Sequence, residues 1–255
     1  MSADKNNKIE NANSLRARYD AWLMTKPVVV REILGWLEVI VVALVLAWLI
    51  TSFIIINATV PTGSMENTIM PGDRLFGLRL TYYFSSPKRG DIAVFKYPVN
   101  ECLLSKLNDK TGKEFIKKYN SVSDDKIRHV NYIKRVIGLP GETVEIRDGK
   151  VYIDGSDEPL DEPYLKEEWI QKNNGITFHV PEGCYLMMGD NRNNSNDARY
   201  WTHNAELLFN MAKDYGCDVD VTEEELEALS YVPKKNMLGK AYVRYWPLNK
   251  ISLIK

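Results

Sequence analysis

Hydroxyl side chains are concentrated in the stretch TVPTGSMENTIMPGD, which covers residues 59–73. Its Gly-Ser-Met sequence predicts a turn that presents Ser64. A serine hydroxyl is a weak nucleophile until a neighbouring base removes its proton. The stretch directly follows a long apolar segment that ends at Ile56. We therefore interpret it as an active site held at a membrane surface, and the rest of the chain must supply the base.

The base for Ser64 can be a histidine or a lysine. The histidines are His129, His179 and His203, and none lies in a recognisable nucleophile or zinc motif. A Ser-His-Asp triad therefore has no positive support. Lysine is the other option, and it acts as a base only where burial disfavours its charged form and lowers its pKa.

The segment VNYIKRVIG has the composition of a strand and contains Lys134. Alternation places Lys134 on one face with Val130, Tyr132 and Val136, and it points Arg135 the other way. Apolar neighbours on that face would remove water from the amine. The alternative is a lysine that extends along the face to reach solvent. The sequence of this segment alone leaves both interpretations open.

The stretch GDNRNNSNDAR, residues 189–199, is dense in Asn, Asp and Ser. Such residues form turns with many bonds between side chains and backbone. A solvated polar loop would have the same composition. Because Met187 and Met188 precede it, we expect the stretch to leave a buried strand.

A membrane segment precedes the hydroxyl-rich stretch. Residues 33–56 carry one charge, Glu38, and are long enough for a helix that spans a bilayer. A buried core helix would have an apolar stripe, whereas this segment is apolar all round. A cleavable signal peptide would have a shorter apolar core and a small-residue cleavage site. We predict a retained transmembrane helix over 33–56.

Basic residues predict the orientation of this helix. They precede it in the polar segment 1–32, and the first basic residue beyond it is Arg74. The positive-inside rule then places 1–32 in the cytoplasm and 57–255 on the other side of the cell membrane. The expected protein is therefore single-pass, with an extracytoplasmic domain.

That outer domain is predicted to be mainly β. RDGK places Asp-Gly between two alternating runs, which is a strong hairpin signal. Two stretches look inserted, a charged one at 101–126 and a helical one at 203–230, where Thr222 and Glu225 fit a capping box. The strand candidates are rich in Val, Ile and Tyr, and they are 91–98, 129–141, 142–155 and 239–247.

Composition excludes some classes of function. The net charge of −1 gives no electrostatic basis for binding nucleic acid. The cysteines, Cys102, Cys184 and Cys217, are scattered and odd in number, so they predict neither a disulfide framework nor a zinc site.

Taken together, these motifs resemble the type I signal peptidases, which are membrane-anchored Ser/Lys endopeptidases of bacteria. The resemblance runs from about Trp36 to the C-terminus and is broken by the two inserts. It implies a signal-peptidase/LexA-like β catalytic domain, with a small cap region within 141–186. After the apolar helix, the matching pieces come in the family's order: PTGSM with PGD following, RGDIAVF, YIKRVIGLPG, GDNRNNSNDAR and GKAYVRYWP.

The resemblance also implies residue roles. Ser64 would be the nucleophile and Lys134 the general base. The hydroxyl of Thr62 would help to form the oxyanion hole, Ser195 would orient the lysine, and Asp197 with Arg199 would form a supporting charge pair. Two positions depart from the family pattern, Asn67 where proline is usual and Ala198 where serine is frequent. Substrate pockets would be lined by Val60, Pro61, Met65, Ile69, Tyr132 and Ile133.

The implied function is removal of signal peptides after an Ala-x-Ala-like site, through an acyl-enzyme and without metal or organic cofactor. The partners are secretory preproteins and the lipid bilayer, with the secretion translocon as a further contact to test, and no nucleic acid. One alternative is a non-catalytic assembly factor for surface proteins that shares the fold. A β module that only binds peptides is another. A LexA-like self-cleaving repressor would need a DNA-binding module and no membrane helix.

Overall fold

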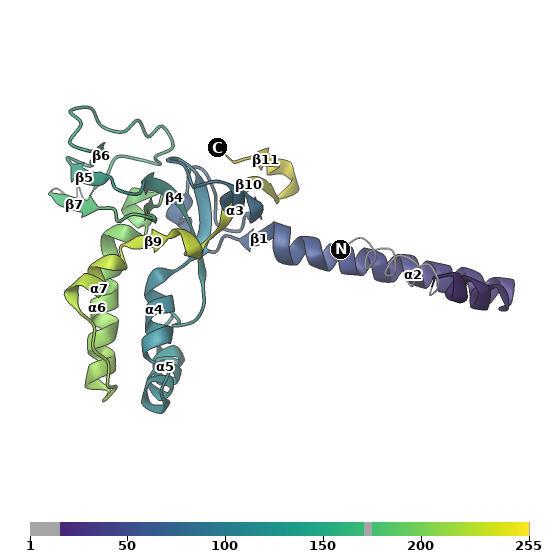
Figure 1. Cartoon of the computed structure of the whole chain (residues 1–255). Helices are drawn as coiled ribbons and strands as arrows, with labels where there is room; N and C mark the ends of the chain where they lie inside the picture. The colour runs from purple at the N-terminus through teal and green to yellow at the C-terminus, as the bar shows by residue number, and fades with distance from the viewer. Residues whose placement is uncertain (1–15, 171–174, 255) are drawn as a thin grey trace, which may run out of the picture. The chain divides into compact units, whose positions relative to one another are not determined.

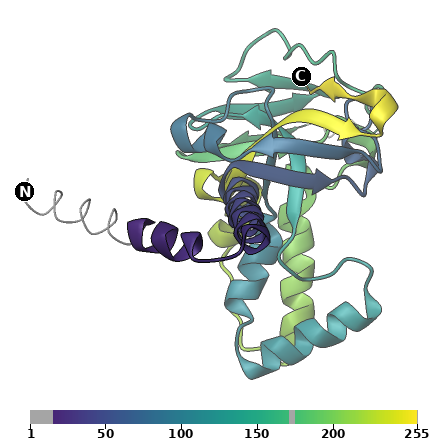
Figure 2. The same cartoon turned by 90° about the vertical axis from the view of Figure 1, so that its right-hand side faces the viewer.

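The computed structural model describes residues 16–170 and 175–254. The chain divides into two compact units, Met1–Ser52 and Phe53–Lys255, and each is described by itself below. Figure 1 gives the element labels, and Figure 2 shows the same chain from the side.

The first unit contains helix α2, Val28–Leu49, which begins directly after Pro27. A short π-helical segment, Ile50–Ile54, continues it, and together they make an apolar helix of 27 residues with a mean hydropathy of 2.6. This length is sufficient to cross the hydrocarbon core of a bilayer. The described residues contain no second helix of this kind.

The helix bounds differ from the predicted 33–56. The helix starts earlier because Pro27, whose fixed φ is compatible with the start of a helix, directly precedes Val28. It ends earlier because Ile55 and Ile56 belong to the first strand and pair with Leu78 and Gly77. Isoleucine suits both an apolar helix and a strand, so the sequence did not reveal this change.

The second unit is built on a large antiparallel sheet, as predicted. Its strand order is β1-β2-β10-β3-β4-β8-β9, and β11 pairs with β10. The mainly β prediction is therefore confirmed. The strands are β1 Ile55–Thr59, β2 Arg74–Leu78, β3 Ile92–Lys96, β4 Asn131–Gly138, β8 Cys184–Met188, β9 Tyr231–Pro233, β10 Met237–Trp246 and β11 Ser252–Leu253.

A second, three-stranded sheet lies within the predicted cap region. Its order is β6-β5-β7, from β5 Thr143–Arg147, β6 Lys150–Ile153 and β7 Ile176–His179. Asp148 and Gly149 both have positive φ, at 49° and 72°, which is the backbone of the tight hairpin that Asp-Gly predicts.

Both inserted stretches are helical. The charged stretch, expected only to be polar, contains α4, Pro98–Lys106, and α5, Lys110–Val122. The second contains α6, Ala198–Asp214, and α7, Glu223–Ala228, whose capping box at Thr222 is present. Figures 1 and 2 show these four helices grouped on one side of the strands, while α3, Leu80–Phe84, lies near β10.

Trp201 of α6 anchors the inserts to the sheet. Its ring is fully buried and lies 5.9 Å from that of Phe95, 5.6 Å from that of Tyr97 and 6.3 Å from that of Tyr132. Tyr132 itself stacks on Tyr97 at 4.2 Å. Because Tyr132 lies on β4 two residues before Lys134, this cluster also fixes the strand that carries the lysine.

Candidate active site

Ser64 lies in a short 3-10 helix, Gly63–Met65, that follows β1. Asn191 fixes the position of this short helix through two hydrogen bonds. Its backbone N–H donates to the Ser64 carbonyl at 3.0 Å, and its side-chain amide donates to the Gly63 carbonyl at 3.0 Å. Asp73 closes the loop, because its carbonyl accepts from the Val60 N–H. The turn is therefore held on the end of the sheet, and Ser64 is 7% exposed.

Lys134, on strand β4, brings its side-chain amine next to the Ser64 hydroxyl. Its Nζ lies 2.6 Å from Ser64 Oγ, although the residues are 70 positions apart. Lys134 pairs with Ala93 of β3, and it is 4% exposed. The open alternative of a lysine that reaches solvent is therefore wrong. Arg135 points to the opposite side of the strand, as the alternation predicted, and contacts Asp190.

The surroundings of Lys134 shift the equilibrium of its amine towards the neutral form. Burial lowers the pKa of Lys134 from its ordinary value to about 8. The carboxylates of Asp197 and Asp190 act the other way, and the Arg199 guanidinium lowers that pKa further. At this pKa about a tenth of the lysine is neutral at pH 7 and able to accept a proton, which is far more than for a lysine with the ordinary pKa of about 10.4.

The two predicted hydroxyl partners differ in their contacts. Thr62 has an extended backbone, and its Oγ1 lies 3.4 Å from Ser64 Oγ. Ser195 is buried, its hydroxyl helps to lower the pKa of the nearby Asp197 carboxyl, and no hydrogen bond joins it to Lys134 among the described contacts. The predicted orienting bond from Ser195 to Lys134 is therefore not formed in this structure, and its role stays a prediction.

Asp197 and Arg199 form a buried charge pair, as the family resemblance implied. Arg199 Nε donates to Asp197 Oδ1 at 2.8 Å, and the side chains are 1% and 0% exposed. Burial by itself raises the pKa of the Asp197 carboxyl, but Arg199 outweighs it and holds that pKa below its ordinary value. Asp197 also begins helix α6 and accepts the Gly189 N–H at 3.0 Å.

Gly189 allows the loop to approach the nucleophile. A side chain at this position would overlap both the Ser195 hydroxyl and the Ser64 carbonyl oxygen. Gly189 and Asn191 were not predicted to have a role, although both lie in the Asn-rich stretch 189–199. The close approach that requires glycine depends on a distant segment, so no local signal could reveal it.

A cavity of about 300 Å³ opens at Ser64 and Lys134. Five of the predicted pocket residues line it: Val60, Pro61, Met65, Tyr132 and Ile133. Ile69 is not among the lining residues, and its side chain packs behind the cavity wall in a small core cluster with Val60 and Met65.

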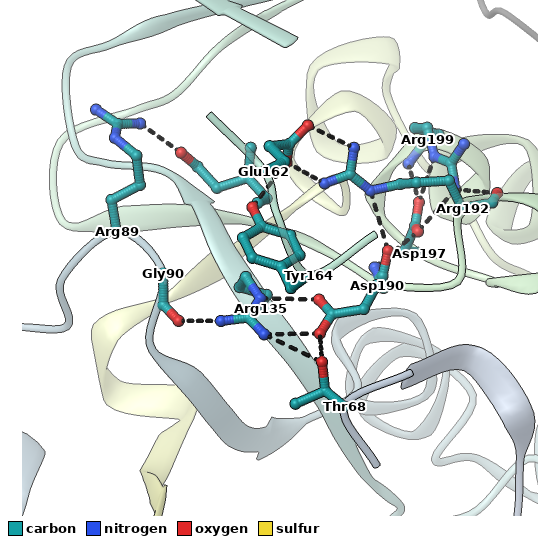
Figure 3. Close-up of polar contacts among 12 residues, drawn as sticks. Thr68, Arg89, Gly90, Arg135, Glu162, Tyr164, Asp190, Arg192, Asp197 and Arg199 are labelled. Atoms are coloured by element: carbon teal, nitrogen blue, oxygen red, sulfur yellow. Dashed lines mark hydrogen bonds and ion pairs between the residues drawn. The ribbon is translucent and has the colours of Figure 1, made fainter. Parts of the chain in front are cut away.

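A buried ion network lies on the other side of β4 (Figure 3). Arg135 donates through Nε and Nη2 to the Asp190 carboxylate at 2.8 and 2.7 Å, and through Nη1 to the Gly90 carbonyl at 2.7 Å. Thr68 donates to the same carboxylate at 2.5 Å. The ring of Tyr164 covers the guanidinium at 3.8 Å.

The network continues into a segment of the cap region, residues 162–170. The Tyr164 hydroxyl donates to Glu162 at 2.7 Å, and Glu162 forms an ion pair with Arg192 (Figure 3). Lys166 pairs with Glu66 at 2.6 Å, two residues after the nucleophile. The 162–170 segment therefore connects the Ser64 turn, through Glu66, to the 189–199 loop, through Arg192. These partners were not among the residues predicted from the sequence.

Asn67, three residues after Ser64, also joins the Ser64 turn to the 162–170 segment. Its φ is 90°, and its side-chain amide donates to the carbonyls of Tyr164 at 3.0 Å and Leu165 at 3.3 Å. Proline, the usual residue at this position in the family that the sequence resembles, has φ fixed near −65° and cannot adopt this backbone.

We expect Asn67→Pro to lower kcat/KM for peptide cleavage by more than about tenfold and to destabilise the fold by about 1–3 kcal/mol, because the turn that carries Ser64 must change its backbone. Kinetics and thermal unfolding would measure both. The matched control is Asn67→Gly, which removes the amide but permits the positive φ, and it should retain more activity. A proline variant with unchanged activity and stability would contradict the role assigned to Asn67.

Comparison with known proteins shows the family of the chain. Residues 33–246 match the family described as "Signal peptidase, peptidase S26". The chain therefore belongs to the signal peptidase family, peptidase S26, and it is an enzyme of the signal peptidase I type. The single long apolar helix among the described residues fits a membrane-anchored member of this family.

Relatives with this name occur in several bacteria. The chain is 32% identical over 220 residues to signal peptidase I of Leptolyngbya laminosa, covering 85% of this chain and 81% of the relative. It is 34% identical over 224 residues to signal peptidase I of Bacillus licheniformis, covering 85% and 90%. A crystal structure of a signal peptidase I from Enterococcus faecalis is similar with a TM-score of 0.35 and 24% identity, covering 61% of this chain and 97% of that one.

Proposed function

We propose that the chain is a membrane-bound serine endopeptidase that removes signal peptides from exported preproteins, with Ser64 as nucleophile and Lys134 as general base. The observation that carries this proposal is the 2.6 Å separation of Lys134 Nζ and Ser64 Oγ. Both side chains are buried, and both line an open cavity. The lowered pKa of Lys134 supports the same assignment.

In the proposed mechanism, Ser64 Oγ attacks the carbonyl carbon of the scissile bond while Lys134 accepts the hydroxyl proton. The negative charge that develops on the carbonyl oxygen is stabilised by the Thr62 hydroxyl and the backbone N–H of Ser64. Lys134 then gives its proton to the leaving amine, and the acyl group remains on Ser64 as an ester. Water, deprotonated by Lys134, hydrolyses this ester and releases the serine.

The substrate would bind as an added strand. β8 pairs with β4 only from Arg135 onward, so the corresponding edge of Asn131–Lys134 has no strand partner among the described residues. Asn131, Tyr132, Ile133 and Lys134 line the cavity along this edge. An extended peptide can donate and accept backbone hydrogen bonds there, and alternate side chains then point into the pocket. Small residues at alternate positions, as in Ala-x-Ala, suit a pocket of this size.

Membrane anchorage would bring enzyme and substrate together. A signal peptide and the apolar helix at Val28–Ile54 would share one bilayer, which raises the effective concentration of substrate. We propose a single-pass topology with the N-terminus in the cytoplasm and Ser64 on the outer side of the cell membrane, because basic residues precede the helix.

Incubation of the detergent-solubilised full chain with a preprotein tests the proposal. We expect one cleavage, and N-terminal sequencing of the product should place it after an Ala-x-Ala-like site. Ser64→Ala is the matched inactive control. A folded chain that leaves several preproteins intact would instead support the non-catalytic assembly factor.

Thr62 gives a separate prediction. We expect Thr62→Val to lower kcat by roughly 10–10³-fold, the scale of a lost oxyanion donor, with little change in KM. Thr62→Ser keeps the hydroxyl and should retain most of the activity. Steady-state kinetics of the two variants test the role of the Thr62 hydroxyl. An unchanged kcat for the valine variant would exclude Thr62 from the oxyanion hole.

A further inference from the structure

A second cavity, of about 540 Å³, adjoins the one at Ser64 and Lys134. The two cavities share part of their lining. The residues that line both are Pro61, Thr62, Asp125, Val130, Tyr132 and Asn196. A chain bound at Ser64 that extends past Thr62 and Tyr132 would reach the second cavity.

The outer walls of this second cavity come from the two helical inserts. One wall is Tyr119 of α5 and the loop that follows it, and the other is α6. A neighbouring face of α6 is buried in the core through Trp201, Ala205 and Phe209. We call the space between these walls the insert groove. The α6 residues that line it recur at helical spacing, and they are Asn204, Leu207, Leu208 and Met211.

The insert groove has an apolar, accessible surface. Leu207 is 50% exposed and Met211 is 49% exposed, although both are large hydrophobic residues. The two lie one helical turn apart and present a continuous apolar stripe. Methionine adapts its shape to different apolar partners, which suits a surface that receives varied side chains.

The loop opposite α6 is held in place before any ligand binds. Asn120 exchanges hydrogen bonds with the backbone of Ile127, at 2.9 and 2.7 Å. Asn100 donates to the carbonyls of Lys126 and Arg128, at 3.1 and 2.9 Å. A preformed wall binds a ligand with a smaller entropic cost than a mobile one.

The charges around the insert groove indicate a polypeptide rather than a polyanion. Asp124 and Asp125 line it together with Lys126 and Arg128, so neither sign dominates. The Lys126 ammonium is already engaged by the carbonyls of Asn120 and Ser123. Nucleic acid would require a surplus of positive charge at this surface.

We propose that the insert groove binds a segment of the same preprotein substrate, some residues away from the scissile bond, with an apolar side chain against Leu207 and Met211. This inference rests on the proposed function of Ser64 and Lys134. Its support is the set of lining residues, Thr62 and Tyr132 among them, that the two cavities share. It gives the helical inserts a role in substrate selection.

Two substrates test the proposal with the full chain in detergent. One is a whole preprotein, and the other is a short peptide limited to the residues next to the cleavage site. Leu207→Glu and Met211→Glu should each raise KM for the preprotein about tenfold, with kcat unchanged, and should leave cleavage of the short peptide unaffected. Leu253→Glu is the matched control, because Leu253 is 72% exposed and does not line the groove.

A photocrosslinking amino acid at position 207, in protein that also carries Ser64→Ala, gives a readout that does not depend on activity. It should become joined to the preprotein and not to the short peptide. An unchanged KM for the preprotein, equal losses on both substrates, or crosslinking to another membrane protein instead would each overturn the proposal. Failure of the proposed function would look different, because the unmodified chain would cleave neither substrate.

Discussion

Replacement of Lys134 by methionine should reduce peptide cleavage by at least about 10³-fold while the chain stays folded. The amine lies 2.6 Å from Ser64 Oγ and is the proposed acceptor of its proton. Loss of a general base typically costs 10²–10⁴-fold, and loss of a nucleophile's only activating group falls at the upper end. Methionine has a similar length and suits the buried site of Lys134, which is 4% exposed.

The matched control for this variant is Lys250→Met, because Lys250 is an exposed lysine. It should cleave a preprotein at the normal rate. Thermal unfolding should show that Lys134→Met is at least as stable as the unmodified chain, since a desolvated amine does not stabilise the core. Normal turnover by Lys134→Met would remove the lysine from the mechanism.

Replacement of Asp197 by asparagine should destabilise the fold by about 3–5 kcal/mol, the cost of leaving one partner of a buried ion pair uncompensated. The Arg199 guanidinium is 1% exposed and pairs with Asp197 at 2.8 Å. Asparagine keeps the shape and can still accept the Gly189 N–H, so the loss should come mainly from the charge. Unfolding of the full chain in detergent measures it.

Two comparisons separate the ion pair from other effects of Asp197→Asn. Combining it with Arg199→Met removes both charges, and the double variant should be less destabilised than the sum of the single ones. Glu145→Gln removes the charge from a pair with Arg147 that is partly exposed and 3.5 Å long, and it should cost at most about 1 kcal/mol. Equal effects at Asp197 and Glu145 would contradict the importance of the buried pair.

The sequence offered Ser64 and Lys134 as candidates through their residue types and strand alternation, and the resemblance to the signal peptidases joined them into a dyad. Alternation correctly placed Lys134 and Arg135 on opposite faces of β4. It could not supply their partners. Asp190 and Glu162 come from distant positions, and their pairing with arginines depends on how the cap region folds back onto the Ser64 turn.

The boundaries of helices and strands were harder to predict where the same residues suit both a helix and a strand. Ile55 and Ile56 continue an apolar helix in composition, but backbone pairing with β2 makes them a strand. Helix α5 was expected only as a charged insert. Its polar face dominates the sequence, while few side chains, among them Phe115, are buried against the core. Burial of that kind depends on tertiary packing rather than on local propensity.

The pH dependence of kcat/KM for a preprotein tests the central claim most directly, because only the neutral form of Lys134 can accept the Ser64 proton. The pKa of Lys134 in the folded chain is about 8. We predict that kcat/KM rises with pH to a midpoint near this value and then levels off. A profile that is flat from mild acid to alkali, or a midpoint near the ordinary lysine value of about 10.4, would contradict a buried lysine base.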